Sequence, residues 1–170
     1  MKFAVVDGRR QEAQPGLTGQ CRGCERQVVA KCGEVRIWHW AHRVRDRCAA
    51  AGETETEWHR AWKNEFPEAW QEFVHTAEDG ERHIADVKTP TDWVLEFQHS
   101  RIEPEERRSR EAYYSRLIWI VDGKKRSRDF PKFMQSWEDG HPRGIESPIR
   151  KLVYPEGALL RDWAGSRAHV

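Results

Sequence analysis

The sequence predicts an α/β protein in which a small N-terminal module rich in cysteine and histidine precedes a unit with the order α-β-β-β-α-β. Three observations favour this class. A Cys-x-x-Cys pair with later His and Cys residues lies within the first 50 positions. From Glu53 to Gly123, segments with helical and strand periodicity follow one another in that order. The chain also holds nine tryptophans, which fill a hydrophobic core with few residues.

The length of 170 residues suffices for one domain and a small module. We therefore expect a Cys/His module at residues 1–50, a core domain at 51–123 and a C-terminal extension at 124–170. The net charge of +1 excludes a global field that would attract polyanions. A local excess exists between Arg101 and Asp129, where nine Lys and Arg residues face six Asp and Glu residues.

No apolar run approaches the roughly 18 residues that a membrane-spanning helix needs, and the N-terminus lacks the apolar stretch of a signal peptide. We therefore expect a cytoplasmic protein with no membrane partner. In a reducing compartment, four cysteines are more readily explained as metal ligands or free thiols than as disulfides.

The N-terminal module is predicted to be built from short strands. Phe3 to Val6 is apolar and ends at the tight-turn pair Asp7-Gly8, which predicts a hairpin closing near Gln14. Two further strands, Gln27 to Ala30 and Val35 to Trp38, are expected on either side of Cys32-Gly33.

Five residues of this module have the spacing of a structural zinc site, in which thiolates and imidazoles form a tetrahedron. They are Cys21, Cys24, His39, His42 and Cys48. We expect Cys21, Cys24 and His42 to bind the ion, with Cys48 or His39 as the fourth ligand and Cys32 as an ordinary strand residue. The alternative is a set of free thiols and surface imidazoles.

After a linker at 49–52, residues 53–66 predict a helix that Pro67 ends. Trp58, Trp62 and Phe66 recur every four residues and are expected to form its buried face. Glu55, His59 and Lys63 follow the same spacing, rotated by about 60° at about 100° per residue, and so line the edge of that face. The alternative is an exposed ladder of charges.

Three strands are predicted next, at Trp70 to Thr76, Ile84 to Val87 and Trp93 to Phe97, with turns at 78–81 and 89–92. The second and third strands each carry a carboxylate among apolar residues, Asp86 and Glu96. Because a carboxylate in mid-strand is costly to bury without a partner or a metal, this pair is the predicted centre of function.

A helix over residues 103–115 and an apolar strand over 117–121 complete the core. Beyond them lie a basic loop, a short helix expected at 133–137 and an amphipathic piece at 159–163, which the sequence does not place.

Asp86 and Glu96, with a third carboxylate from the preceding helix, would form an oxygen-rich site suited to Mg²⁺ or Mn²⁺. Such ions activate water and stabilise the leaving oxygen in phosphodiester hydrolysis. Gln98 lies on the same strand face as Glu96 and could orient the water. On the next helix, four side chains could contact nucleic acid, namely Arg107, Arg108, Arg110 and Tyr114.

An ordered series of motifs resembles the competence protein CoiA-like nucleases, from about Phe3 to Gly123. The series is Cys21-x-x-Cys24, His39-Trp-Ala-His42, Glu55-Thr-Glu-Trp-His59-x-x-x-Lys63, Ala85-Asp86-Val87, Glu96-Phe-Gln98-x-Ser100-x-Ile102, Arg110-x-x-x-Tyr114 and Ile118-Trp-Ile120. The resemblance implies a PD-(D/E)xK, or restriction-endonuclease-like, core behind a small Cys/His module.

The resemblance implies that Asp86 and Glu96 bind the catalytic metal and that Glu55 is the acid of the first core helix. Gln98 falls where many members of the superfamily have a lysine, so Lys63 or His59 is expected to supply the positive charge. Ser100, Arg107, Arg110 and Tyr114 are the expected nucleic-acid contacts. The leading hypothesis is a Mg²⁺-dependent nuclease acting on single- or double-stranded DNA; the alternatives are a silent zinc-containing nucleic-acid-binding module and a zinc-dependent interaction domain.

Overall fold

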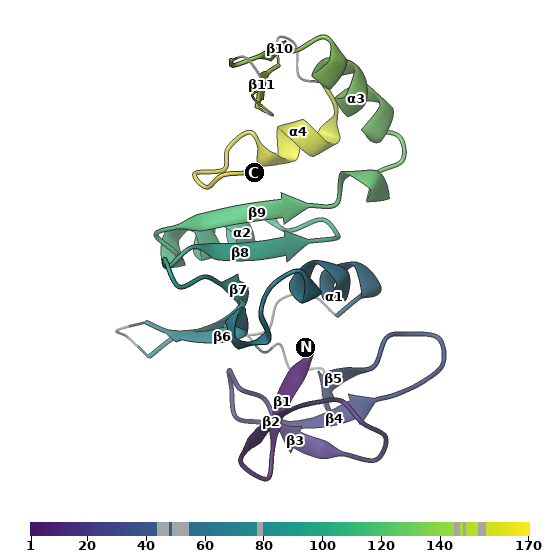
Figure 1. Ribbon diagram of the computed structural model, residues 1–170, viewed down its shortest axis with the longest axis vertical. Coiled ribbons are helices and arrows are strands. Elements are labelled where there is room, and N and C mark those ends of the chain that lie inside the picture. The colour runs from purple at the N-terminus through teal and green to yellow at the C-terminus, as the bar shows by residue number, and fades with distance from the viewer. Residues whose placement is uncertain (44–47, 49–54, 78–79, 145–146, 148, 153–155) are drawn as a thin grey trace.

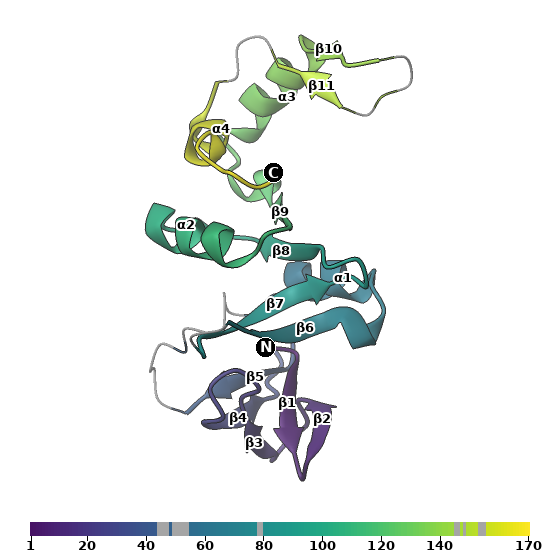
Figure 2. The ribbon, with the colours of Figure 1, turned by 90° about the vertical axis from the view of Figure 1, so that its left-hand side faces the viewer.

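The computed structural model describes the chain apart from residues 44–47, 49–54, 78–79, 145–146, 148 and 153–155. An N-terminal sheet, a central sheet with its helices and a C-terminal segment follow one another along the longest axis (Figures 1 and 2). The expected linker at 49–52, the first residues of the expected helix at 53–54 and part of the turn at 78–81 lie outside the described residues. In the part of the chain that is described, no helix is long and apolar enough to cross a membrane.

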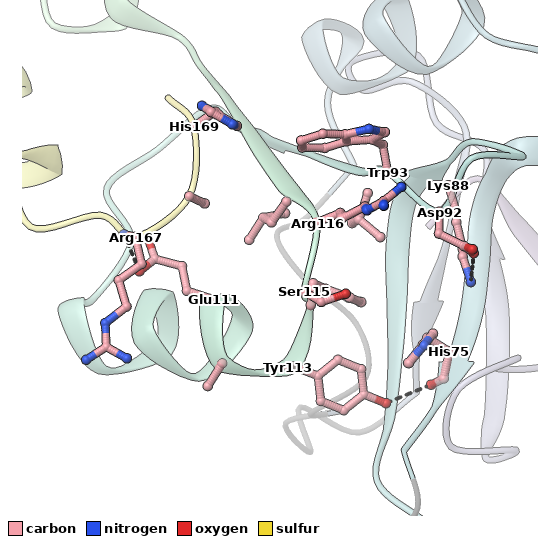
Figure 3. A pocket seen from close by; sticks show the side chains of 15 residues that line it. His75, Lys88, Asp92, Trp93, Glu111, Tyr113, Ser115, Arg116, Arg167 and His169 are labelled. Carbon is pink, nitrogen blue, oxygen red and sulfur yellow. Dashed lines mark hydrogen bonds and ion pairs between the residues drawn. The ribbon is translucent and has the colours of Figure 1, made fainter.

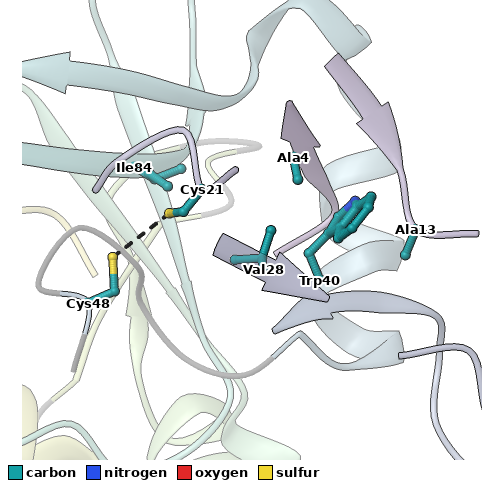
Figure 4. Close-up of a cluster of buried hydrophobic side chains, with 7 residues drawn as sticks. All are labelled: Ala4, Ala13, Cys21, Val28, Trp40, Cys48 and Ile84. Atoms are coloured by element: carbon teal, nitrogen blue, oxygen red, sulfur yellow. Dashed lines mark hydrogen bonds between the residues drawn. The ribbon is translucent and has the colours of Figure 1, made fainter. Parts of the chain in front are cut away.

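The N-terminal sheet is antiparallel, with the order β2-β1-β3-β4-β5. Its strands are β1 (Phe3–Val6), β2 (Arg9–Glu12), β3 (Thr18–Gln20), β4 (Gln27–Lys31) and β5 (His39–His42). As predicted, β1 and β2 form a hairpin around Asp7-Gly8, where both residues have positive φ angles of 48° and 76°. Ala4, Val28 and Trp40 form the core of this sheet (Figure 4).

The strand that pairs with β4 is β5, and the prediction of a strand over Val35 to Trp38 is wrong. Val35 is 94% exposed and Trp38 is 47% exposed, whereas Trp40 is 1% exposed. The physical reason is burial: pairing through His39–His42 brings the indole of Trp40 into the core, which a strand four residues earlier would leave in water.

The central sheet has the order β6-β7-β8-β9, antiparallel except for the last, parallel pair. The elements of this region are α1 (Glu57–Asn64), the 3-10 turn η1 (Glu68–Trp70), β6 (Gln71–Thr76), β7 (Arg82–Lys88), β8 (Val94–Gln98), α2 (Pro104–Tyr113) and β9 (Leu117–Val121). The predicted order α-β-β-β-α-β is therefore observed, with α2 as the crossover between parallel strands.

Both faces of the central sheet are covered, which explains why every residue of β8 is buried. On one face, Leu95 and Phe97 pack beside Trp58 of α1. On the other face, Val94 and Trp119 pack against the C-terminal segment.

The predicted face of helix α1 packs against the Phe97 ring through all three of its aromatic side chains, but it is not the most deeply buried part of the helix. His59 and Lys63 are its buried residues, while Trp62 is 38% exposed and Trp58 is half-buried. Glu55, which is also buried, precedes the N-cap Thr56 and is not part of the helix. Lys63 can be buried because three carboxylates surround its ammonium group, as described below.

The C-terminal segment completes the core on the second face of the sheet. It contains η2 (Gly123–Lys125), α3 (Phe130–Glu138), β10 (His141–Pro142), β11 (Arg150–Lys151) and α4 (Ala158–Trp163). Leu159 and Trp163 of α4 are buried, and the ring of Trp163 lies 5.3 Å from that of Trp119. His169 forms a parallel bridge with Ile118 of β9. These contacts tie the segment to the central sheet.

Candidate functional site

Three cysteines and one histidine lie together at one end of the N-terminal sheet. Cys21 and Cys24 belong to the loop between β3 and β4, His42 ends β5, and Cys48 follows it. Their ligand atoms all lie within 4.8 Å of one another. Cys21 Sγ is 3.9 Å from Cys48 Sγ, and Cys24 Sγ is 3.2 Å from His42 Nε2 (Figure 4 shows the first pair).

This arrangement suggests zinc binding. Zn–S bonds of about 2.3 Å in a tetrahedron place two sulfurs about 3.8 Å apart, which agrees with the Cys21–Cys48 distance of 3.9 Å and is far from a disulfide. Of the two residues considered for the fourth position, Cys48 lies in the cluster. His39 is buried elsewhere and its Nδ1 is 2.8 Å from the carbonyl oxygen of Ile37. Cys32 also lies outside the cluster.

The thiols of the cluster differ in acidity without a metal. Burial raises the pKa of Cys21 to about 12. Burial also acts to raise the pKa of Cys24, but hydrogen bonds from Arg26 outweigh it and lower the pKa to about 6. Because zinc binds thiolates, a bound ion would have to displace a proton from Cys21.

The second candidate site lies where β7 and β8 separate. Their pairing covers only Val87 with Leu95 and Lys88 with Val94. Beyond it, side chains replace the missing backbone partners of Phe97. Its N–H donates to Asp86 Oδ2 at 3.0 Å, and its carbonyl oxygen lies 2.9 Å from His59 Nε2. The gap between the strands thereby opens without leaving these backbone groups unsatisfied.

Both ring nitrogens of His59 lie within hydrogen-bonding distance of a partner. A carbonyl oxygen only accepts, so Nε2 carries the proton that it donates to Phe97. Nδ1 lies 2.8 Å from Thr56 Oγ1, whose hydroxyl can donate to it. Both ring nitrogens therefore have partners, and His59 ties α1 to β8.

Lys63 lies at the centre of a group of buried carboxylates. Its Nζ is 2.5 Å from Glu55 Oε2, 2.9 Å from Glu72 Oε1 and 3.8 Å from Asp86 Oδ1. Burial acts to lower the pKa of the Lys63 ammonium, but these three carboxylates outweigh it and raise the pKa above its ordinary value. Lys63 is therefore a permanent cation of the site.

Glu96 has one paired and one unpaired oxygen. Oε2 accepts from Arg110 at 2.9 Å, while Oε1 is buried and has no partner among the described residues. Burial raises the pKa of Glu96 to about 8, although the Arg110 guanidinium acts in the opposite direction. A buried carboxylate oxygen without a partner is costly, and a cation or a water molecule would satisfy it.

A cavity of about 30 Å³ lies between these groups, with Lys63, Asp86, Glu96 and Gln98 among its lining residues. This volume holds an ion or a water molecule and excludes a nucleotide. Five acids line the cavity and only two Lys or Arg residues do; the acids are Glu55, Glu72, Asp86, Glu96 and Glu106. The excess of carboxylates favours a cation, and oxygen ligands favour a hard one.

The structure thus brings together the six residues predicted to be catalytic: Glu55, His59, Lys63, Asp86, Glu96 and Gln98. The predicted nucleic-acid contacts are arranged differently. Arg107, Arg110 and Tyr114 are buried, with Arg110 paired to Glu96 and Arg107 donating to the carbonyl oxygen of Asp162. Their burial does not fit direct contact with a nucleic acid, because each side chain is used inside the core. Ser100 and Arg108 are exposed.

Glu72 belongs to the site and was missed in the sequence. Its carboxylate accepts from the backbone N–H groups of Lys2 (2.5 Å) and Phe3 (2.9 Å) as well as from Lys63. The Glu72 carbonyl also accepts from Arg22, which lies beside Cys21. The backbone of Glu72 has a positive φ of 45°, which is rare for glutamate and which no signal in the sequence predicts.

A larger cleft of about 740 Å³ lies at the opposite end of β8, between Trp93, Tyr113 and the C-terminal tail (Figure 3). Three of its charged groups are already engaged: Lys88 pairs with Asp92 at 3.2 Å, and Arg116 donates to the carbonyl oxygen of Thr91. Its size therefore does not make it the reactive site.

Comparison with known proteins identifies one segment of the chain. Residues 17–51 match the family model of the competence protein CoiA, N-terminal domain. This match supports the predicted CoiA-like family and covers Cys21, Cys24, His42 and Cys48. No curated protein and no solved structure matches the chain.

Proposed function

We propose that this chain, whose residues 17–51 match the CoiA N-terminal domain, is a divalent-metal-dependent nuclease that hydrolyses phosphodiester bonds in DNA. The observation that supports it most directly is the pair of carboxylate oxygens at the gap between β7 and β8. Among the described residues, Asp86 Oδ1 has only a long 3.8 Å contact with Lys63, and Glu96 Oε1 has no partner. Both residues line the 30 Å³ cavity.

In this proposal the core is of the PD-(D/E)xK type, with Asp86 and Glu96-x-Gln98 as the motif. The α-β-β-β-α-β order and the parallel β8–β9 pair are consistent with it. Asp86 and Glu96 would hold Mg²⁺ or Mn²⁺, which when bound activates water and neutralises charge on the phosphate.

The other residues of the site would position these two ligands. Asp86 is fixed through its second oxygen by the N–H of Phe97, and Glu96 is fixed by Arg110. Gln98 donates through Nε2 to the carbonyl oxygen of Ser100 at 3.0 Å. Lys63 would supply fixed positive charge beside the phosphate, since its ion pairs keep it protonated.

A second candidate is the binding module that hydrolyses nothing. The specific observation in its favour is that Lys63 is bound tightly by Glu55 and Glu72, while Gln98 adds no charge. If both carboxylates keep the ammonium away from a substrate, the site would bind an ion without cutting DNA.

Incubation of the zinc-loaded protein with supercoiled, linear and single-stranded DNA in Mg²⁺ or Mn²⁺ tests the proposal. Asp86→Asn and Glu96→Gln are suitable variants, because each amide oxygen can still accept the hydrogen bond from Phe97 or Arg110. We expect cleavage by the wild type and background levels in both variants and in EDTA. Absence of cleavage of every substrate, with no divalent-ion binding by calorimetry, would refute it.

A further inference from the structure

A second hollow adjoins the carboxylate cavity and is separate from the cleft of Figure 3. We call it the basic hollow; it has a volume of about 160 Å³, and its lining includes Ser100, Arg101, Lys125 and Arg126. Gln98 lines both the basic hollow and the carboxylate cavity, so the two spaces are neighbours on either side of one side chain.

The two spaces have opposite charge. Acids exceed Lys and Arg residues by five to two around the carboxylate cavity. Around the basic hollow, four Lys or Arg residues face two acids: Arg101, Arg107, Lys125 and Arg126 against Asp122 and Asp162. A cation-binding space therefore lies directly beside a space that attracts anions.

Two of these four cations are engaged within the protein, and the other two are available to a ligand. Arg126 is paired with Asp162 at 2.7 Å, and Arg107 donates to the Asp162 carbonyl oxygen at 2.9 Å. By contrast, the side chains of Arg101 and Lys125 are exposed and make no ion pair or hydrogen bond with the residues that the structure describes. The two acids do not compete for them: Asp162 is held by Arg126, and Asp122 accepts from the Lys124 N–H at 3.0 Å and lies 2.8 Å from His99 Nδ1.

The fold explains why these residues meet. Arg101 follows the carboxyl end of β8, and Lys125 lies in η2, directly after the carboxyl end of β9. Because β8 and β9 are parallel neighbours, these ends lie at one edge of the sheet, where α/β proteins commonly bind ligands. Leu159 and Trp163 of α4 add an apolar wall to the basic hollow.

We propose that Arg101 and Lys125 bind a backbone phosphate of the nucleic acid next to the phosphodiester that is cut. This inference rests on the proposed nuclease function and names a contact of the same site. The basic hollow has several times the roughly 30 Å³ share of one water molecule, which is room for a phosphate group with its ester oxygens. Gln98 lies between the position of this phosphate and the carboxylate cavity, because it lines both spaces.

Binding of a fluorescein-labelled 20-nucleotide oligo(dT), measured by anisotropy at several salt concentrations, tests the proposal. The full zinc-loaded chain carries Asp86→Asn throughout, so that no cleavage occurs. The test variant combines Arg101→Gln with Lys125→Gln. The control combines Arg9→Gln with Lys31→Gln, two exposed cations of the N-terminal sheet.

Loss of two phosphate contacts should lower the slope of log K against log salt by about 1.4, at about 0.7 per contact on a single strand. The control should keep the slope, and the swap of Arg101→Lys with Lys125→Arg should largely restore it. Equal slopes in the test variant and the parent would overturn the proposal, as would an equal loss in the control.

A competition arm separates two sources of the phosphate. If inorganic phosphate binds the parent but not the test variant in calorimetry, and at saturation and constant ionic strength leaves the oligonucleotide bound to the parent, the basic hollow is a site for free phosphate alone, and the proposal fails. The slope measurement is independent of cleavage. A reduced slope with no cleavage by the wild type would refute hydrolysis and keep the phosphate contact. Cleavage with unchanged slopes would support hydrolysis and overturn the phosphate contact.

Discussion

Replacing Glu72 by glutamine tests how the carboxylate cavity is held to the N-terminal sheet. The Glu72 carboxylate is 3% exposed and accepts from two backbone N–H groups of β1 and its flank and from Lys63. In Glu72→Gln the amide NH₂ would face at least one of these donors, and Lys63 would lose one of its two close counter-charges.

The magnitude follows from the pKa of Glu72. Burial acts to raise it, but Lys63, the N-terminal ammonium and the Lys2 N–H outweigh burial and lower the pKa from 4.5 to about 2. At about 1.4 kcal/mol per unit, ionised Glu72 stabilises the fold by about 3 kcal/mol at pH 7. Because the folded-state pKa is the lower one, this contribution is complete above pH 4.5 and is lost as the pH falls towards 2.

Urea unfolding followed by tryptophan fluorescence measures the effect. We expect Glu72→Gln to lower the free energy of unfolding by about 3 kcal/mol at pH 7 and by about 2 kcal/mol at pH 3.5. The matched control is Glu68→Gln, because the Glu68 side chain is exposed and its one ion pair, with Arg10, is long at 3.8 Å among the described residues. This variant should change the free energy of unfolding by less than about 0.5 kcal/mol. A loss below about 1 kcal/mol at pH 7, or one independent of pH, would refute the reasoning.

Three further outcomes are expected. Cys24→Ser and His42→Ala should lose tightly bound zinc, whereas His39→Ala and Cys32→Ser should retain one ion per chain by atomic absorption, because only the first pair lies in the cluster; loss in His39→Ala would contradict the assignment. Since the pKa of Glu96 is raised to about 8 by burial, Mg²⁺ binding below that pH should release a proton, and calorimetry should show affinity rising from pH 6.5 to 8.5; equal affinities would count against Glu96 as a ligand. His59→Leu removes the donor to the Phe97 carbonyl and should destabilise the chain by about 1–3 kcal/mol in urea unfolding, and wild-type stability would exclude that positioning role.

Local patterns in the sequence were sufficient for the element order and for three residues of the Cys/His cluster. Residues with strand propensity between clear turns predicted β7, β8 and β9, and the Asp7-Gly8 pair predicted the first hairpin. These signals are local, because propensity and turn chemistry act within a few residues. Asp86 and Glu96 also stand out locally, as charges within apolar strands.

The buried face of α1 was decided by tertiary structure. Periodicity predicted Trp58, Trp62 and Phe66 as that face, and hydrophobicity alone would support it. Those three rings do contact Phe97, but Lys63 and His59 are buried more completely. They can be, because three carboxylates and the Phe97 carbonyl satisfy them from outside the helix. An amphipathic pattern does not reveal partners that lie on other strands.

The sequence by itself determined the order of elements, the Cys/His module and the two strand carboxylates. Only the tertiary structure decided that Cys48 and not His39 joins the Cys/His cluster, that Arg110 pairs with Glu96, and that Glu72 links β1 to Lys63. The physical reason is the same in each case. These choices depend on distances between segments far apart in the chain, and a buried polar group takes whichever partner the packed fold brings within hydrogen-bonding distance.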